Sequence, residues 1–154
     1  MMHLDKFDRK ILDQLQREGR LTSNELAALV SLSPSQCSRR RARLEKEGFI
    51  QGYRAELSFE KLGYGMLVMI WVTLASHNRD NAAHFAEFLG GLPEVLEAHA
   101  LTGDMDYFLK VATTDLQALS RLVNDQLLAH ETVSHVKTAI VLQTLKEYQG
   151  LPLG

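Results

Sequence analysis

The sequence has one cysteine, three prolines and no long apolar run. With Cys37 alone, the chain can form no internal disulfide and offers no cluster of thiolates for zinc. No run of about 18 apolar residues is available to cross a bilayer, and the opening MMHLDKFDRK lacks the apolar core of a signal peptide. We therefore expect a soluble, cytoplasmic protein without a membrane partner.

Motifs of catalysis are lacking as well. The six histidines show no HExxH or comparable ligand spacing, and no GxSxG, phosphate loop or dinucleotide fingerprint occurs. Gly63 and Gly65 lead into an apolar run instead of following one, so they do not form a nucleotide site. These absences predict a protein that is not an enzyme and that has no cofactor and no metal site.

Charge is distributed unevenly along the chain. Residues 1–56 hold 11 Lys and Arg against 8 acids, a net charge of +3, whereas the remainder holds 6 against 11, a net charge of −5. With 45% apolar residues, the chain can bury one core or two small ones. The asymmetry indicates an N-terminal part that faces a polyanion and an acidic part with another task.

Three short helices are expected in the first third of the chain. For the first, Asp5 is a suitable N-cap and Gly19 a suitable C′ residue. Its helically spaced apolar residues are Phe7, Ile11, Leu12 and Leu15. The motifs TSNE and SPSQ each predict a capping box at the start of a further helix. These boxes pair Thr22 with Glu25 and Ser33 with Gln36.

The second and third helices have helix-turn-helix spacing. One ends near Val30 and the next starts at Pro34, which leaves a turn of about three to four residues. The second helix should bury Leu26, Leu29 and Val30. After the third helix, Phe49 and Ile50 should complete the core, and Gly52 should allow a turn into a short wing strand.

The third helix carries four arginines in five residues. A solvated surface is the alternative interpretation, but the N-terminal residues of such a helix lie nearest the base edges in the DNA major groove. Ser35, Gln36 and Ser38 are therefore candidates to contact bases, Arg39 to contact guanine or a phosphate, and Arg40 and Arg43 to contact phosphates. The remaining candidate DNA-binding residues are Thr22, Ser23, Ser33 and Arg54.

Two further residues of this helix lie on the stripe that faces the other helices, at 100° per residue. Arg41 could extend its charged head out of the helix interface or pair with an acid such as Asp8 or Asp13, and the sequence does not decide between these alternatives. Cys37 is expected to be a small core residue, with a redox switch as the alternative.

The rest of the chain has the order βαββαβ. Strands are predicted at Met66–Leu74, VLEAHALTG, YFLKVA and from about Val133 to Lys146. One predicted helix has an inner face of Phe85, Phe88, Leu89 and Leu92, and the other has Leu116, Leu119, Val123 and Leu127. This order is that of a ferredoxin-like four-stranded antiparallel sheet with both helices on one face. The open, apolar face implies a partner, most simply a second copy.

Over nearly its whole length the chain resembles the leucine-responsive/asparagine-responsive (Lrp/AsnC, feast-famine) transcriptional regulators. The matching stretches are LDKFDRKIL, GRLTSNELA, LSPSQCSRRRARLEKEGFIQGY, LPEVLEAHALTGDMDYFLKV and VKTAIVLQTLKE. The resemblance implies an α+β chain with four parts. These are a winged helix-turn-helix domain at 1–53, a hinge strand (near 55–59) and linker at 54–65, a ferredoxin-like βαββαβ regulatory (RAM-type) domain at 66–148 and a flexible tail at 149–154.

The resemblance also implies partners and an effector site. Family members bind double-stranded DNA, dimerise through the sheet and often form octamers, with an amino acid bound between dimers. The residues that match the family's effector site are Thr102, Gly103, Asp104, Asp106, Thr138, Ala139 and Ile140. Gly103 permits close backbone approach, and an acid suits an ammonium group. The alternative for GDMD is a polar hairpin turn.

We therefore expect a sequence-specific transcriptional regulator that responds to an amino acid. The alternative is an architectural DNA-bending protein whose C-terminal domain only oligomerises, without an effector. Only the first function predicts a response to amino acids. RNA binding is disfavoured, because the sheet is expected to lack the aromatic and basic residues that stack on bases.

Overall fold

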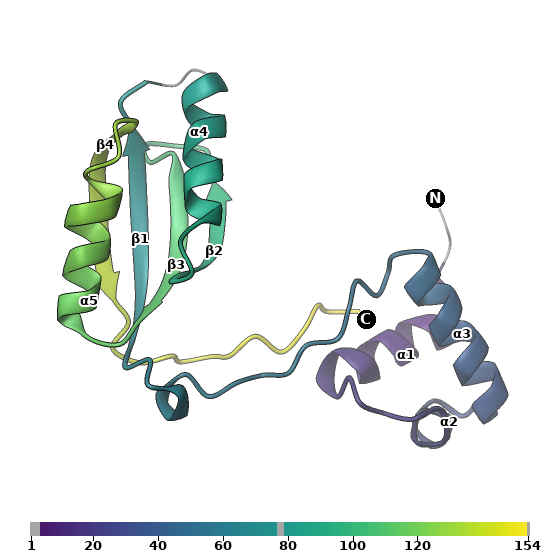
Figure 1. Cartoon of the computed structure of the whole chain (residues 1–154). Coiled ribbons are helices and arrows are strands. Elements are labelled where there is room, and N and C mark those ends of the chain that lie inside the picture. The colour runs from purple at the N-terminus through teal and green to yellow at the C-terminus, as the bar shows by residue number, and fades with distance from the viewer. Residues whose placement is uncertain (1–3, 77–78, 154) are drawn as a thin grey trace. The chain divides into compact units, whose positions relative to one another are not determined.

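The computed structural model describes residues 4–76 and 79–153, and it divides into two compact units. The first unit comprises Met1–Glu56 together with Leu145–Gly154, and the second comprises Leu57–Thr144. The first unit is helical, and the second is a sheet covered by helices (Figure 1). His3 and His77, two of the six histidines considered above, lie outside the described residues.

The first unit is built from α1 (Lys6–Arg17), α2 (Ser23–Val30) and α3 (Pro34–Lys46). All three predicted N-caps are confirmed: Asp5, Thr22 and Ser33 each accept hydrogen bonds from backbone N–H groups of the first turn. The two predicted capping boxes are present, and Asp8 completes a third box at α1. Each helix start is therefore fixed by its local sequence.

The core of this unit is small and lies between the three helices. It consists of Ile11, Leu15, Leu26, Ala27, Val30, Cys37 and Leu44. Two predicted core residues are not buried: Leu29 is 54% exposed and Phe49 is 39% exposed. In α2, Ala27 is buried in place of Leu29, because Leu26, Ala27 and Val30 fall within one arc of the helix at 100° per residue and Leu29 lies outside that arc. Cys37 is fully buried, as expected.

Gly19 stands at the predicted C′ position of α1, directly after the C-cap, but it lacks the left-handed conformation of a C′ glycine. The helix ends at Arg17, its C-cap Glu18 is extended, and Gly19 does not adopt a positive φ. A Cβ on Gly19 would instead lie 3.1 Å from Cδ1 of the Tyr53 ring. The glycine is thus explained by the close approach of an aromatic ring.

The predicted wing and hinge strands are absent from this chain. Residues 51–58 form no strand, and all of them are exposed. A strand needs a neighbour to which its backbone can hydrogen bond, and no other segment of the described chain pairs with residues 51–58. The segment is followed by a short 3-10 helix, η1 (Glu60–Leu62).

The second unit has the predicted βαββαβ order. Its strands are β1 (Met66–Leu74), β2 (Val95–Ala100), β3 (Tyr107–Thr113) and β4 (Val133–Ile140). They form one antiparallel sheet in the order β2-β3-β1-β4. β4 is shorter than predicted: Ile140 lies opposite Val68, and the last bond runs from Val141 N–H to the Leu67 carbonyl. The ladder ends there because β1 itself begins at Met66.

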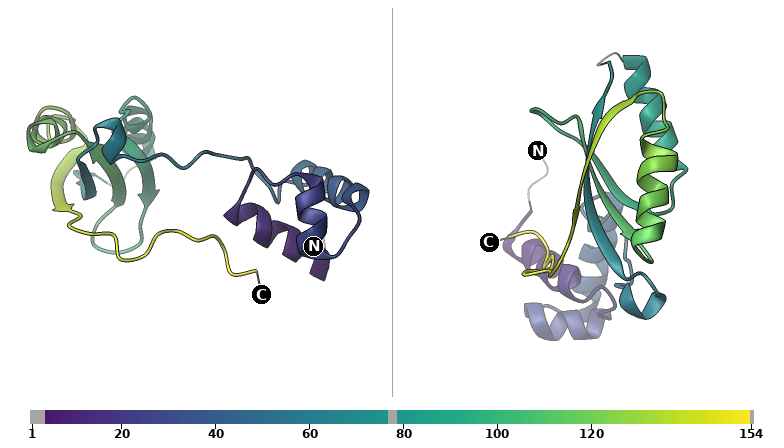
Figure 2. Two further views of the ribbon diagram at one scale, coloured as in Figure 1. Left: turned by 90° about the horizontal axis from the view of Figure 1, so that it is seen from below. Right: turned by 90° about the vertical axis from the view of Figure 1, so that its left-hand side faces the viewer.

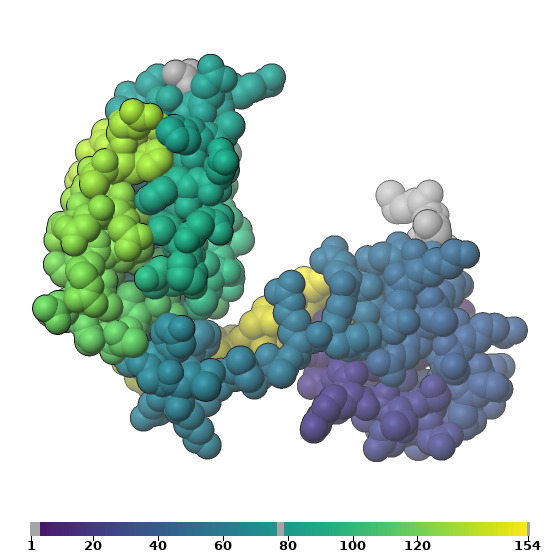
Figure 3. All heavy atoms as spheres, viewed as in Figure 1, coloured from purple at the N-terminus to yellow at the C-terminus, as the bar shows by residue number. Residues whose placement is uncertain are grey.

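Both helices of this unit cover one face of the sheet (Figure 2). They are α4 (Arg79–Gly90) and α5 (Leu116–Arg121), and α5 continues as the π-helix η2 (Leu122–Leu127). The two helical segments lie side by side in Figure 3, and the ring of Phe88 is 4.2 Å from that of His130, three residues after η2. Leu116 was expected on the inner face but is 64% exposed, because it is the first residue of α5.

The other face of the sheet carries large side chains that no helix covers. Trp71 and Phe108 contact each other there, with ring centroids 5.5 Å apart. Lys137 lies over the Trp71 ring, and His99 stacks on Phe108. The expectation that this face lacks aromatic and basic residues is therefore wrong, while the expectation of a large apolar open face is confirmed.

Candidate DNA interface and effector loop

The turn between α2 and α3 is three residues long and locally determined. Ser31 has a left-handed conformation, with φ of 59°, and ends α2 through a hydrogen bond from its N–H to the Ala27 carbonyl. Ser33 then caps α3, and Pro34 occupies its first turn, where no N–H is needed. The predicted helix-turn-helix geometry is therefore present.

The N-terminal half of α3 presents polar side chains to solvent. Ser35, Gln36, Ser38 and Arg39 are all exposed. The Oε1 atom of Gln36 accepts from both the N–H and the hydroxyl of Ser33, at 3.1 Å each. Its Nε2 donors bond to no other described residue, and Arg39 forms no ion pair within residues 4–76 or 79–153. These donors remain available to an external acceptor such as a base edge or a phosphate.

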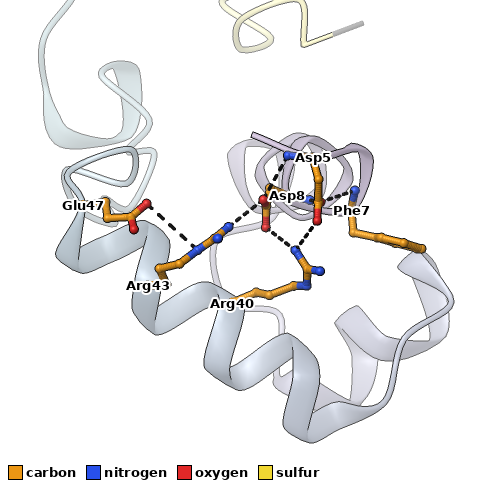
Figure 4. Close-up of polar contacts among 6 residues, drawn as sticks. All are labelled: Asp5, Phe7, Asp8, Arg40, Arg43 and Glu47. Carbon is orange, nitrogen blue, oxygen red and sulfur yellow. Dashed lines mark hydrogen bonds and ion pairs between the residues drawn. The ribbon is translucent and has the colours of Figure 1, made fainter. Parts of the chain in front are cut away.

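Arg40 and Arg43 differ from Arg39, because both point back toward α1 (Figure 4). Arg40 Nη1 lies 2.7 Å from Asp8 Oδ1 and 2.8 Å from Asp5 Oδ2. Arg43 Nη2 lies 2.6 Å from Asp8 Oδ2. The Asp8 side chain is 1% exposed, so its charge is stabilised by two guanidinium groups instead of water.

Asp5 belongs to the same cluster. The Asp5 carboxylate accepts a hydrogen bond from the Asp8 N–H, and this bond, together with the Arg40 guanidinium, lowers the pKa of Asp5 to about 2. The two carboxylates in turn raise the pKa of Arg40, with the hydrogen bond to Asp8 the larger cause. This role of Asp5 and Asp8 was not predicted from the sequence. Their spacing of three residues at a helix start was a usable signal, because it matches a capping box.

Arg41 pairs with neither Asp8 nor Asp13. Its Nη1 donates to the Leu21 carbonyl at 2.7 Å, and its Nε donates to the Tyr53 hydroxyl at 2.9 Å and to Glu45 at 3.2 Å. The guanidinium carbon is also 4.7 Å from the centre of the Tyr53 ring. Arg41 therefore connects α3 to the chain before α2 and to the segment after α3.

The remaining candidate DNA-binding residues lie at helix starts or in the linker. Thr22 and Ser33 are exposed N-caps, Ser23 is half-buried in the first turn of α2, and Arg54 is exposed in the strandless segment 51–58. Thr22 and Ser33 also serve their capping boxes, so their side chains have structural roles besides any contact to DNA.

The predicted effector loop lies between β2 and β3. Gly103 has φ of 123°, a conformation that side chains rarely adopt, so the loop turns at a position that favours glycine. Asp104 is exposed, whereas Asp106 is half-buried and its Oδ2 accepts from the Leu74 N–H at 2.7 Å. Backbone bonds from Asp106 N–H to Val72 and from Leu101 N–H to Asp106 hold the loop against β1.

The other half of the predicted effector site lies elsewhere on the sheet. Thr138, Ala139 and Ile140 pair with Ile70, Met69 and Val68 in β1. Thr138 is thus four β1 residues from Leu74, about 13 Å along the strand. β1 also separates β4 from the loop-bearing strands. One chain therefore does not bring the two groups of candidates together.

Two kinds of site find no support in the described part of the chain. No group of three or more His, Cys, Asp or Glu is gathered there in a way that could hold a metal ion. None of its helices has the length and hydropathy of a membrane-crossing segment.

Fold and site together define a DNA-binding transcriptional regulator with a helix-turn-helix unit and a separate ligand-binding domain. Residues 4–51 match the family model of winged helix-turn-helix DNA-binding domains, and residues 67–151 match that of the Lrp/AsnC ligand binding domain. The chain belongs to the Lrp/AsnC family, which is a family of transcription factors and not of enzymes.

Individual relatives agree with this assignment. The chain is 38% identical over 148 residues to the leucine-responsive regulatory protein of Escherichia coli K12, an alignment that covers 96% of this chain and 90% of that protein. A crystal structure of a transcriptional regulator from Neisseria meningitidis in complex with L-Met is 42% identical, with a TM-score of 0.94 and coverage of 98% and 97%. Escherichia coli AsnC is 29% identical, with a TM-score of 0.84 and coverage of 97% and 100%.

Proposed function

We propose that the chain regulates transcription in the cytoplasm by binding DNA sequence-specifically as a homodimer, and that an amino acid controls this binding. The observation that carries the proposal is the exposed N-terminal half of α3 in a member of this family. Ser35, Gln36 and Ser38 contact base edges, and Arg39 contacts a guanine or a phosphate.

The other candidates position the protein on the DNA backbone. Arg43, Thr22, Ser23, Ser33 and Arg54 contact phosphates or the adjacent sugar backbone. Arg40 has a second role, because its guanidinium is engaged by two carboxylates and therefore also fixes α3 on α1. A phosphate contact by Arg40 would compete with Asp5, the more exposed of the two partners.

The homodimer forms through the open face of the sheet. Trp71 and Phe108 are large side chains that a second copy would bury there. Two copies present two recognition helices, so the DNA site is roughly palindromic, with half-sites about 34–36 Å or a multiple of this apart. Dimers assemble further, up to an octamer, when the effector site between them is completed.

The effector is an amino acid with a free ammonium group. The Neisseria meningitidis relative is described in complex with L-Met, which supports this class of ligand. Asp104 is exposed and suits the ammonium, while Thr102 and Gly103 offer main-chain groups beside it. Thr138, Ala139 and Ile140 come from a neighbouring chain, because one chain keeps them apart from the loop.

A thermal-shift scan against the twenty amino acids at millimolar concentration tests the effector. A ligand at about 100 times its dissociation constant adds roughly 2.7 kcal/mol of stability, which a melting curve resolves. We expect a selective shift that disappears in Asp104→Ala. No shift with any amino acid would favour the architectural alternative, in which the C-terminal domain only oligomerises.

Selection from random-sequence DNA tests the other half of the proposal. We expect enrichment of a palindromic site by the unmodified protein and loss of that preference in Gln36→Ala or Ser38→Ala. Binding without any sequence preference would contradict sequence-specific regulation.

A further inference from the structure

Leu151 is held by a reciprocal pair of hydrogen bonds to one side chain of α1. The Leu151 N–H donates to Gln16 Oε1 at 2.8 Å, and Gln16 Nε2 donates to the Leu151 carbonyl at 2.9 Å. A carboxamide is suited to this contact, because it carries a donor and an acceptor side by side, as a peptide group does. Asp13 accepts a further bond from Gln16 Nε2 at 3.2 Å and so orients the carboxamide.

Gly150 independently indicates a specific contact. Its φ is 94°, a conformation that L side chains rarely adopt, and a Cβ at this position would overlap the side chain of Gln16. Only glycine satisfies both conditions, because it combines free backbone geometry with the absence of a side chain. A mobile tail would place no such demand on one residue.

A second attachment lies about two turns nearer the N-terminus of α1. Arg9 Nη1 donates to the Leu153 carbonyl at 3.2 Å, and Arg9 and Gln16 share one face of the helix because they are seven residues apart. Leu153 also lines a groove of about 500 Å³ together with Leu29 and Val30 of α2. Leu29, which is exposed and is not part of the core of this unit, thus lines the same groove as the tail residue Leu153.

We propose that α1 carries a docking site for the chain's own C-terminal segment, residues 149–153. The segment runs antiparallel to α1, with Leu151 at Gln16 and Leu153 at Arg9. The docking connects the DNA-binding unit to the ligand-binding domain a second time, because the same segment follows β4. The ten residues 141–150 can span up to about 35 Å, so the docking accommodates a range of placements of the two units.

Amide hydrogen exchange on the full chain tests the docking directly. We expect the Leu151 amide to exchange about fivefold more slowly than an unprotected amide, and Gln16→Ala or Gly150→Ala to abolish this protection. Gln51→Ala and Gly52→Ala are the matched controls, because Gln51 is exposed and nothing lies within 4 Å of a Cβ at Gly52. An unprotected Leu151 amide in the unmodified chain, or protection that survives Gln16→Ala, would overturn the proposal.

Cysteine cross-linking tests whether the docked segment comes from the same chain. The double variant Gln16→Cys/Leu151→Cys should form a cross-link within one chain, while Gln51→Cys/Leu151→Cys should form none. The native Cys37 does not interfere because it is fully buried. A mixture of the two single variants, Gln16→Cys and Leu151→Cys, should give no cross-linked dimer. A dimer in that mixture without an intrachain product would overturn the assignment to the chain's own tail.

Discussion

The buried carboxylate of Asp8 lies 2.7 Å from the Arg40 guanidinium and joins α1 to the recognition helix α3. Arg43 contacts the other oxygen of the same carboxylate, and Asp5 contacts Arg40 from the helix N-cap. The orientation of α3 therefore depends on a charged contact as well as on the small apolar core between the helices.

The first prediction concerns this carboxylate. Asp8→Ala should lower the free energy of unfolding of the first unit by about 1–3 kcal/mol, because Arg40 and Arg43 lose their shared partner but are themselves only partly buried. Urea unfolding followed by circular dichroism measures the change. Glu18→Gln is the control, since it weakens an exposed ion pair with Arg20 and should leave stability nearly unchanged. Equal effects in the two variants would show that Asp8 has no special role.

A second prediction separates Arg39 from Arg40. Arg39→Ala should weaken DNA binding and reduce the salt slope by about one unit, because one phosphate or base contact is lost, while stability is unchanged. Arg40→Ala should also reduce stability, since Asp8 then loses a partner in a buried position. Binding titrations at several salt concentrations, together with urea unfolding, measure both effects.

Arg121→Ala provides the control for these two variants. It removes the same charge from an exposed position in the second unit. DNA affinity and salt slope should be unchanged. If Arg39→Ala behaved like this control, Arg39 would not be part of the DNA interface.

The helix starts and the order of helices and strands along the chain were predictable from the sequence, because each is determined by nearby residues. Ser33, Pro34 and Gln36 specify the start of α3 through contacts within four residues. The apolar run Met66–Leu74 likewise specifies a buried strand without reference to its neighbours. Such contacts need no knowledge of the tertiary fold.

Pairings between distant residues were not predictable in this way. Arg41 was expected to extend outward or to pair with an acid such as Asp8 or Asp13; it does pair with an acid, Glu45, and it also bonds Leu21 and Tyr53. Helical geometry gives the face on which an arginine lies, but several carboxylates are within reach of its long side chain. The wing and hinge strands were predicted wrongly for a related reason. A strand forms only where a second strand pairs with it, and no segment of the described chain pairs with residues 51–58.

A third prediction separates the two acids of the effector loop. Asp106→Ala should destabilise the second unit by about 1–3 kcal/mol, because the Leu74 N–H loses its acceptor. Asp104→Ala should leave stability unchanged, since Asp104 is exposed, and should remove only the thermal shift caused by the effector. Melting curves with and without ligand distinguish the two effects. Loss of stability in Asp104→Ala would contradict this division of roles.

The last prediction concerns pH and the ring cluster beside α4. His130 packs against Phe85, Phe88 and His84, and its Nδ1 accepts from the Thr132 N–H at 3.4 Å. Burial is the main cause that lowers the pKa of His130 below 6.5, and the nearby His84 lowers it further, against a small opposing effect of Glu131. Protonation would add a charge to this apolar cluster and remove the acceptor at Nδ1.

Because the folded-state pKa of His130 is below its unfolded value, the unfolded chain binds the proton first as the pH falls. The contribution of His130 to stability is therefore complete above about pH 6.5 and decreases as the pH falls through its folded pKa. Trp71 fluorescence during urea unfolding, measured from pH 7.5 to 5, should show a falling midpoint. The slope should be reduced in His130→Phe, which keeps an aromatic ring but cannot bind a proton. It should be retained in His135→Gln, an exposed control on β4. An unchanged slope in His130→Phe would mean that other groups cause the acid sensitivity of this unit.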